Sequence, residues 1–273
     1  MTSFMLWFDN HLLQEGEAYS NQTGKLYYLD DSRLPAPYKS YASPYKQWVN
    51  DSSITGETNP IIPTSFNGSG RADGLIFDFE NGRVIETGGS LSEGETLTGT
   101  FAVKDFNIYV TNQTEDDLII ENKFEINSRY DKVPGAVIPY DQMLPAIFIN
   151  SEHMKNEGFA LGGEDKTTST IKAIILAENS YQLDGVLSIF ADSARRSFSK
   201  IPFSGYPVTE YGDIKNGSYN YTDLSNLYDA SNPYYIEDVV VSKFSETTQD
   251  KIPGGVKIGS IDFEVVTIRF PRS

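Results

Sequence analysis

The sequence contains no cysteine and only two histidines in 273 residues. Without thiols, a disulfide framework, a cysteine-ligated zinc or iron–sulfur centre and a thiol nucleophile are all excluded. The histidines, His11 and His153, lie far apart in the chain, and no Gly-x-Ser-x-Gly elbow accompanies either of them. The chain therefore lacks the residue patterns of the common nucleophilic hydrolases, and we predict that it is not an enzyme.

Basic residues are also scarce, because 22 Lys and Arg face 38 Asp and Glu, a formal net charge of -16. A chain this acidic is repelled by phosphate and by anionic lipid, which argues against sequence-independent binding of nucleic acid. No apolar run approaches the roughly 18–20 residues that cross a bilayer. The first residues have no basic start and no small-residue cleavage site, so we expect no secretory signal and no membrane contact.

Carboxylate pairs are more frequent than histidines. Asp78 and Glu80 would share one face of a strand, a spacing that a glycosidase with two carboxylates could use. Short acidic runs could also bind Ca²⁺, but none has the spacing of an EF-hand loop. The solvated face of a hairpin is the simpler interpretation in so acidic a chain. We therefore predict no catalytic residue, no metal and no cofactor.

Residues 1–70 are predicted to form an extended arm with loops, rich in proline and tyrosine. Pro35, Pro37 and Pro44 make a central strand improbable there, and aromatic rings stand between them. Such rings suit docking on another subunit, although an ordered loop covering the chain's own core would explain them equally well. The predicted interface residues, in this arm and in a later loop at 211–235, are Tyr38, Tyr41, Tyr45, Trp48, Tyr219 and Tyr221.

Residues 71–273 are predicted to form a β-rich domain. Leu75, Phe77 and Phe79 alternate with Ile76, Asp78 and Glu80, and Asn81-Gly82 follows as a type I′ turn before the return strand at 83–85. This hairpin is the firmest local prediction. Further strands are expected at 97–103, 106–110, 118–124, 146–150, 168–176, 236–244 and 257–270. The last of these changes phase after Val265, which indicates a β-bulge or a change of packing partner.

One convincing helix is predicted, at about 179–198. Leu183, Val186, Leu187 and Phe190 fall on one stripe at helical spacing, and Asn179 with Gln182 forms a plausible capping box. The chain is therefore predicted to be α+β and mostly β, with antiparallel, β-sandwich-like sheets and one main amphipathic helix.

Several segments resemble virion structural proteins of tailed bacteriophages, in particular those of marine and cyanobacterial phages. These segments are 42–49, 74–84, 103–109, 145–150 and 176–185. The order of a strand, an amphipathic helix and a closing antiparallel pair also resembles the neck and tail-terminator class, in which copies form a ring between head and tail.

The resemblance implies a structural component of the virion, at the head–tail connection or the tail end. It would assemble as a ring, such as a hexamer, with adjacent virion proteins. DNA would pass through the acidic channel without specific binding. The alternative is a carbohydrate-binding β-sandwich module, since aromatic residues and acidic loops are its ingredients. A glycoside hydrolase is the third and least favoured interpretation.

Overall fold

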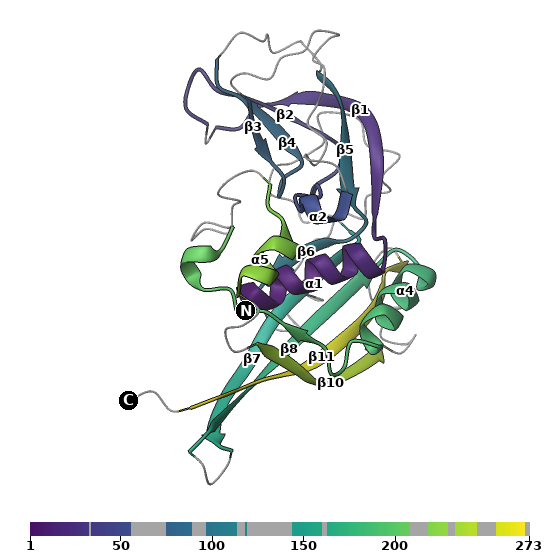
Figure 1. Cartoon of the computed structure of the whole chain (residues 1–273). Coiled ribbons are helices and arrows are strands. Elements are labelled where there is room, and N and C mark those ends of the chain that lie inside the picture. The colour runs from purple at the N-terminus through teal and green to yellow at the C-terminus, as the bar shows by residue number, and fades with distance from the viewer. Residues whose placement is uncertain are drawn as a thin grey trace.

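The computed structural model of the chain describes residues 1–32, 34–55, 75–88, 97–113, 118, 144–159, 163–207, 218–228, 233–244 and 255–270. Strands dominate it, and they form a five-stranded and a six-stranded sheet. Helix α1 lies between the two sheets (Figure 1). The fold is α+β and mostly β, as the sequence predicts.

The elements have the following bounds. The helices are α1 (Thr2–Glu15), α2 (Ser52–Thr55), α4 (Ser180–Ala191), η1 (Phe203–Gly205) and α5 (Tyr221–Tyr228). The first strands are β1 (Tyr19–Leu29), β2 (Lys39–Ala42), β3 (Leu75–Asp78), β4 (Arg83–Glu86), β5 (Leu97–Lys104) and β6 (Asn107–Val110). The later strands are β7 (Ala146–Gly158), β8 (Asp165–Ala177), β9 (Ser197–Phe198), β10 (Tyr234–Lys243) and β11 (Lys257–Arg269).

The six-stranded sheet has the order β6-β7-β8-β11-β10-β9. All neighbouring pairs are antiparallel except β6 and β7, which run parallel. Strands β7, β8 and β11 are each 13 residues long, so they span about 43 Å at the usual rise of a strand. The far ends of β7 and β8 project beyond the helices as a long hairpin (Figure 1).

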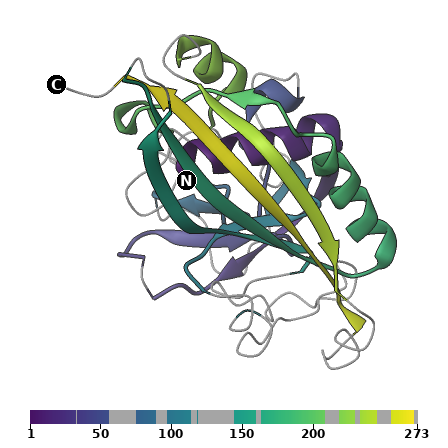
Figure 2. The ribbon, with the colours of Figure 1, turned by 90° about the horizontal axis from the view of Figure 1, so that it is seen from below.

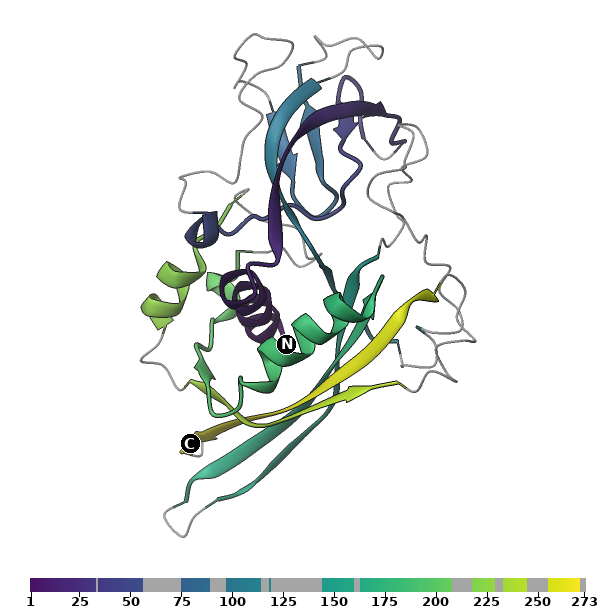
Figure 3. The same ribbon diagram turned by 90° about the vertical axis from the view of Figure 1, so that its right-hand side faces the viewer.

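Helices α1 and α4 pack on the same face of this sheet (Figure 3). The Phe8 ring of α1 stacks on Phe190 of α4 at 4.1 Å between ring centroids, and Phe4 meets Phe263 of β11 edge-on at 5.0 Å. Aromatic pairs in these geometries add to the large apolar area that each ring buries. The main core of the molecule is therefore built from the two helices and the helix-facing side of the sheet.

The five-stranded sheet is antiparallel throughout, in the order β3-β4-β2-β1-β5. It curls around its own smaller core, which contains Tyr41, Trp48, Val84 and Phe101. The β3–β4 hairpin is confirmed, but its connection is a four-residue turn rather than a two-residue type I′ turn. Asp78 pairs with Arg83, and within the turn only Gly82 has a positive φ, of 60°.

The structure differs from the predicted arm over residues 1–70. Residues 2–15 are helix α1, and residues 19–29 and 39–42 are strands of the five-stranded sheet. Polar as well as apolar side chains of α1 are buried, among them Asp9, Asn10 and His11. A helix surrounded by protein shows no amphipathic stripe, which is why the helical pattern is weak in the sequence.

Helix α4 is confirmed, but it ends at Ala191 instead of continuing to residue 198. Asn179 caps it by accepting a hydrogen bond from Gln182 N at 2.9 Å, as the capping box predicts. Arg195 has a φ of 67°, outside the range of a right-handed helix, and the chain then turns into β9. Arg195 and Arg196, which the predicted bounds of 179–198 include in the helix, therefore lie beyond it.

The other predicted strands at 97–103, 106–110, 146–150, 168–176, 236–244 and 257–270 are all present, several with longer bounds. The predicted strand at 118–124 lies outside the described residues except for Leu118. Part of the predicted loop at 211–235 is helix α5. The bulge is on β10, between Ile236 and Asp238, and it faces the point where β11 changes phase.

Candidate functional site

Trp48 and Tyr41, two of the predicted interface residues, lie inside the five-stranded sheet. Trp48 is 2% exposed, its ring stacks on Phe101 at 4.8 Å, and its Nε1 donates to Ser43 Oγ at 3.1 Å. Tyr41 is completely buried. Both residues therefore serve this chain's own core, which agrees with the alternative interpretation of the proline-rich segment.

The remaining candidates do not form a surface either. Tyr45 is half-buried beside the same core, and Tyr219 and Tyr221 belong to the core under α1. Of the six predicted residues only Tyr38 is exposed, at 39%. The structure thus does not bring these aromatic residues together as an accessible interface, because burying their rings stabilises the fold more than exposing them would.

A buried polar cluster lies where α1 meets the five-stranded sheet, and we call it the junction cluster. It consists of Asp9, Asn10, Asp51, Lys104 and Tyr219, each less than a tenth exposed. Lys104 Nζ lies 2.8 Å from Asp9 Oδ2, and Asn10 Nδ2 donates to Asp51 Oδ2 at 2.9 Å. These contacts tie α1 to β5 and to the start of α2.

The ionisable groups of the junction cluster shift one another's pKa values. Burial raises the pKa of the Asp9 carboxyl, although the neighbouring Lys104 ammonium opposes this shift. Burial also disfavours the ammonium, but the carboxylates of Asp9, Glu80 and Asp51 outweigh it and raise the pKa of Lys104. Burial, together with the same carboxylates, raises the pKa of Tyr219 well above its usual value. The cluster therefore holds a charged lysine beside a neutral tyrosine at neutral pH.

Gln47 connects the two sheets. Its side-chain amide mimics a strand neighbour, because Oε1 accepts from Ile108 N at 2.8 Å while Nε2 donates to Ile108 O at 2.9 Å. Nε2 also donates to Glu80 Oε2 at 2.9 Å. Ile108 belongs to β6 of the six-stranded sheet, so this one glutamine extends backbone pairing from one sheet to the other. The carboxylate of Glu80 is used in this contact.

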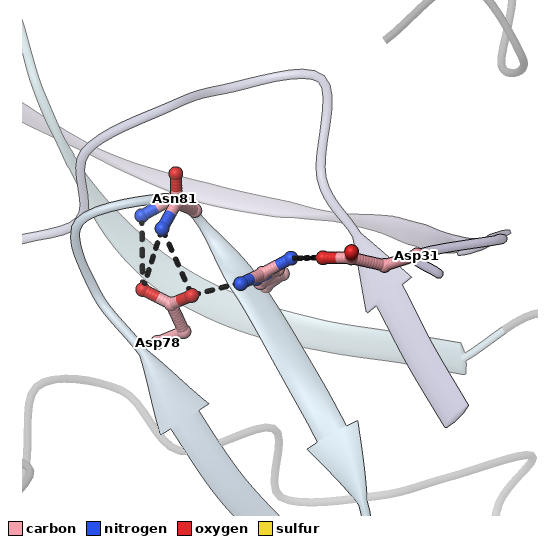
Figure 4. A network of polar contacts seen from close by, with 4 residues as sticks. Asp31, Asp78 and Asn81 are labelled. Atoms are coloured by element: carbon pink, nitrogen blue, oxygen red, sulfur yellow. Dashed lines mark hydrogen bonds and ion pairs between the residues drawn. The ribbon is translucent and has the colours of Figure 1, made fainter. Parts of the chain in front are cut away.

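A second polar network closes the β3–β4 hairpin (Figure 4). Arg83 donates through Nε to Asp78 Oδ2 at 2.6 Å and through a terminal nitrogen to Asp31 Oδ2 at 2.5 Å. Asp78 in turn accepts from the Asn81 side chain. Asp78 and Glu80, which the sequence offered as a carboxylate pair, are thus bound to separate partners.

The two histidines lie on different elements. His11 of α1 is buried, and its ring stacks on Trp7 at 5.2 Å. Burial, followed by the positive charge of Arg196, lowers the pKa of His11. His153 lies on the exposed part of β7, with Nε2 3.4 Å from Thr170 Oγ1. Among the described residues, no group of three His, Asp or Glu side chains is placed to hold a metal ion.

An accessible feature is the part of the six-stranded sheet, on the side opposite α1 and α4, that lies towards the far ends of β7 and β8, and we call it the uncovered face (Figure 2). Towards β6 the same side of the sheet is covered, because Phe148, Ile174 and Leu176 pack there in a buried cluster with Leu118 and Leu144. Side chains of β8 point alternately to the two sides of the sheet. Ile171, Ala173 and Ile175 point to the helices, as their place in the main core shows, and the residues between them point to the other side. The lysines at this face are Lys155, Lys166 and Lys172, and the carboxylates are Glu152, Glu157, Glu237, Asp238, Asp262 and Glu264.

Ion pairs run across the uncovered face. Lys172 lies 3.6 Å from Asp262 on β11 and 3.8 Å from Glu152 on β7, and Lys166 lies 2.5 Å from Glu237 on β10. Exposed pairs of this kind contribute little to stability. Among the described residues of this face carboxylates outnumber lysines, so its net charge is negative. Tyr235 and Val240 add exposed apolar area beside these charges.

Neither a scan against protein-family models nor a search of curated proteins finds a match to this sequence. Within the described ranges, no helix combines the length and the apolar character needed to span a bilayer. Function must therefore be argued from the surfaces that the fold itself presents.

Sequence reasoning missed the length of the central strands and with it the uncovered face. The segment 165–170, Asp-Lys-Thr-Thr-Ser-Thr, is entirely polar, and the predicted strand, which starts at residue 168, leaves out its first three residues. The signal that could have found it is the high β-propensity of three threonines in four positions. The segment 151–158, Ser-Glu-His-Met-Lys-Asn-Glu-Gly, has no β-branched residue and one apolar side chain, Met154, so no strand signal marks it.

Proposed function

We propose that this chain is a self-assembling structural subunit of a tailed-phage virion, working in a ring at the head–tail connection or the tail end. The observation that supports this proposal is the uncovered face. A sheet surface that carries a net negative charge, on the side opposite α1 and α4, suits the wall of an aqueous channel.

The negative charge of such a wall would repel DNA. A duplex moving through a channel must not adhere to it, and net negative charge opposes contact with phosphates. The lysines of the uncovered face pair with carboxylates, so they are not free to form a basic track. The helices on the opposite face would then point outward, towards neighbouring virion proteins.

The second interpretation, a carbohydrate-binding module, draws less support from the structure. A sugar site needs exposed aromatic rings near polar groups. Trp48 and Tyr41 are buried in the core, and the exposed rings of Tyr181, Phe203 and Tyr235 belong to three different elements, α4, η1 and β10. We therefore retain the assembly function as the proposal.

Light scattering on the purified chain tests it. We expect particles with a mass several times the 30.5 kDa of one chain, either alone or on mixing with virion proteins from an infected host. Electron microscopy of such particles is expected to show rings. A chain that remains a 30.5 kDa monomer at high concentration and in both conditions would contradict the proposal.

A further inference from the structure

The outer edge of β7 lacks a strand partner over half of its length. Strand β6 pairs with β7 only from Ala146 to Ile149. From Glu152 to Gly158 the strand is exposed, and among the described residues nothing pairs with its outer side. A free strand edge presents unpaired N–H and C=O groups and is a template for another chain.

A second free edge lies on the opposite side of the same sheet. Strand β9 pairs with β10 only at Tyr234 and Tyr235, and Arg196 adds a backbone bond to Ile236. The outer edge of residues 237–243 is unpaired within the described chain, and all but Val239 of this segment are exposed. The two free segments, 152–158 and 237–243, have equal length.

A groove runs beside this second edge, between β10 and α4. It has a volume of about 340 Å³, and its apolar lining comes from Leu187, Ala191 and Val241. Met154, on the free edge of β7, is 62% exposed, and it lies on the helix-facing side of the sheet because it pairs with Ser169, two residues from Ile171. Val241 lies on that same side, opposite the core residue Ile261.

The directions of β7 and β10 would allow them to pair between two copies of the chain. In the run β7-β8-β11-β10 every neighbour is antiparallel, so β7 and β10 run in opposite directions. When copies are related by rotation about a ring axis, each strand keeps the same direction along that axis in every copy. The β10 of one copy and the β7 of the next would therefore meet antiparallel, with the helices of both copies on one side.

The backbone N–H and C=O groups of the two free edges also point the right way for this pairing. Phe159 N donates to Glu164 O across the β7–β8 hairpin, and Phe244 N donates to Ile258 O on β11. Because these directions alternate along a strand, the amides of Met154 and Val241 both point to the free edges. A register that places Met154 opposite Val241 makes them a hydrogen-bonded pair.

We propose that the free edge of β7 in one copy of this chain pairs antiparallel with the free edge of β10 in the next copy, with Met154 seated in the β10–α4 groove. In this register Lys155 lies opposite Val240, beside both Glu157 and Asp238, and its single positive charge offsets part of the repulsion between these two facing carboxylates. The inference rests on the proposed assembly function, and it names the interface that closes the ring.

Engineered disulfides test the pairing directly, because the chain has no cysteine of its own. A hydrogen-bonded antiparallel pair brings Cα atoms to about 5.5 Å, a separation that suits a disulfide. The double variant Met154→Cys with Val241→Cys is therefore expected to give a ladder of covalent oligomers on mild oxidation. The control, Met154→Cys with Val240→Cys, places its second thiol on the opposite face and is expected to stay unlinked.

A second variant tests the backbone bonds. Met154→Pro removes one outward-pointing amide from an edge position, where proline is tolerated, and is expected to reduce the oligomer to monomers. Met154→Ala keeps the amide, so a particle of partly reduced stability is expected. Circular dichroism checks that both variants are folded.

The outcomes separate the two proposals. Particles that form in the parent chain but show no difference between the two cysteine pairs, or that survive Met154→Pro unchanged, would overturn the edge pairing and leave the assembly function standing. A parent chain that stays monomeric would overturn both. A ladder specific to Met154→Cys with Val241→Cys supports both.

Discussion

Arg83 shows how much of this fold depends on single charged side chains. Its guanidinium is 8% exposed and bridges Asp31, which is 1% exposed, and Asp78, which is 15% exposed. Asp31 follows β1, Asp78 ends β3 and Arg83 begins β4, so one side chain fixes three segments of the five-stranded sheet. The bidentate fork of arginine suits this role better than the single ammonium of lysine.

Replacing Arg83 by Met is therefore expected to be costly. The substitution removes the guanidinium that pairs with both carboxylates, and breaking a buried ion pair in this way costs about 3–5 kcal/mol of unfolding free energy. Urea denaturation measures the change. Lys155→Met, which removes only the exposed pair with Glu157, is the control and is expected to leave the midpoint in place. Equal midpoints for the two variants would show that the Arg83 network is not structural.

Tyr219 is expected to make the chain sensitive to alkali. Its folded-state pKa lies well above the ordinary value of 10.0, so below pH 10 both the folded and the unfolded state carry the proton. Above pH 10 the unfolded chain loses this proton first, and stability falls by up to about 1.4 kcal/mol per pH unit for each such group.

The variant Tyr219→Phe cannot lose a phenolic proton. Its unfolding free energy is therefore expected to fall less steeply with pH than that of the parent between pH 10 and 11.5. Chemical denaturation at several pH values measures both slopes, and Tyr181→Phe, at a position 92% exposed, is the control. Parallel slopes for parent and Tyr219→Phe would contradict the assignment.

At the scale of single residues, the sequence predicted neither the buried positions of the aromatic residues nor the junction cluster. Trp48 and Tyr41 were identified as significant, but composition does not distinguish an aromatic residue at an interface from one in a β core. The junction cluster has no local pattern, since Asp9, Asp51 and Lys104 come from segments that only the tertiary fold brings together.

Elements were predicted well where a periodic pattern and a local signal coincide. Helix α4 has an apolar stripe and a capping residue at Asn179, and both are confirmed. Helix α1 has neither a side-chain cap nor an acidic first turn, and it is buried by protein on several sides. Its helicity is imposed by packing rather than by propensity, so the sequence alone does not reveal it.

Two glycines near α4 are expected to respond oppositely to alanine. A Cβ at Gly185, within the helix, would meet no atom within 4 Å, whereas a Cβ at Gly259 of β11 would lie 2.9 Å from Leu183 Cδ1 and 3.0 Å from Ser242 O. Gly185→Ala is therefore expected to stabilise the chain by about 0.5–1 kcal/mol, because alanine loses less entropy in a helix.

Gly259→Ala is expected to destabilise the chain by about 1–3 kcal/mol, since the backbone atom of Ser242 cannot easily move away. Thermal unfolding of the two variants beside the parent gives the signs directly. Opposite signs support the close packing of α4 on β11. Two stabilised variants would show that the helix lies further from the strand.

At the scale of the whole molecule, α1 unites the two sheets. Its aromatic residues enter the core of the six-stranded sheet, while Asp9 and Asn10 reach the polar groups beneath the five-stranded sheet. Fold class follows from strand patterns and was predicted, but this arrangement depends on contacts between residues far apart in sequence. No local pattern encodes such contacts.

Phe8→Ala tests whether the two sheets unfold as one unit. Phe8 is completely buried against Phe190, so the variant is expected to lose about 3–5 kcal/mol. The fluorescence of the two tryptophans reports on the unfolding of the two sheets separately, because Trp7 lies in the larger core and Trp48 in the smaller one. In single-tryptophan backgrounds, Trp7→Phe and Trp48→Phe, we expect both fluorescence transitions to shift together. A Trp48 transition that keeps its midpoint would show two independent units.

The contact between Phe4 and Phe263 has a consequence for how the protein is made. Helix α1 cannot complete its packing until β11 has been synthesised, because Phe263 of that strand is one of its core contacts. Any product that stops before β11 lacks the strand that pairs along the whole of β8. Chains that lack β11 are therefore expected to expose apolar surface and to be targets for chaperones and proteases.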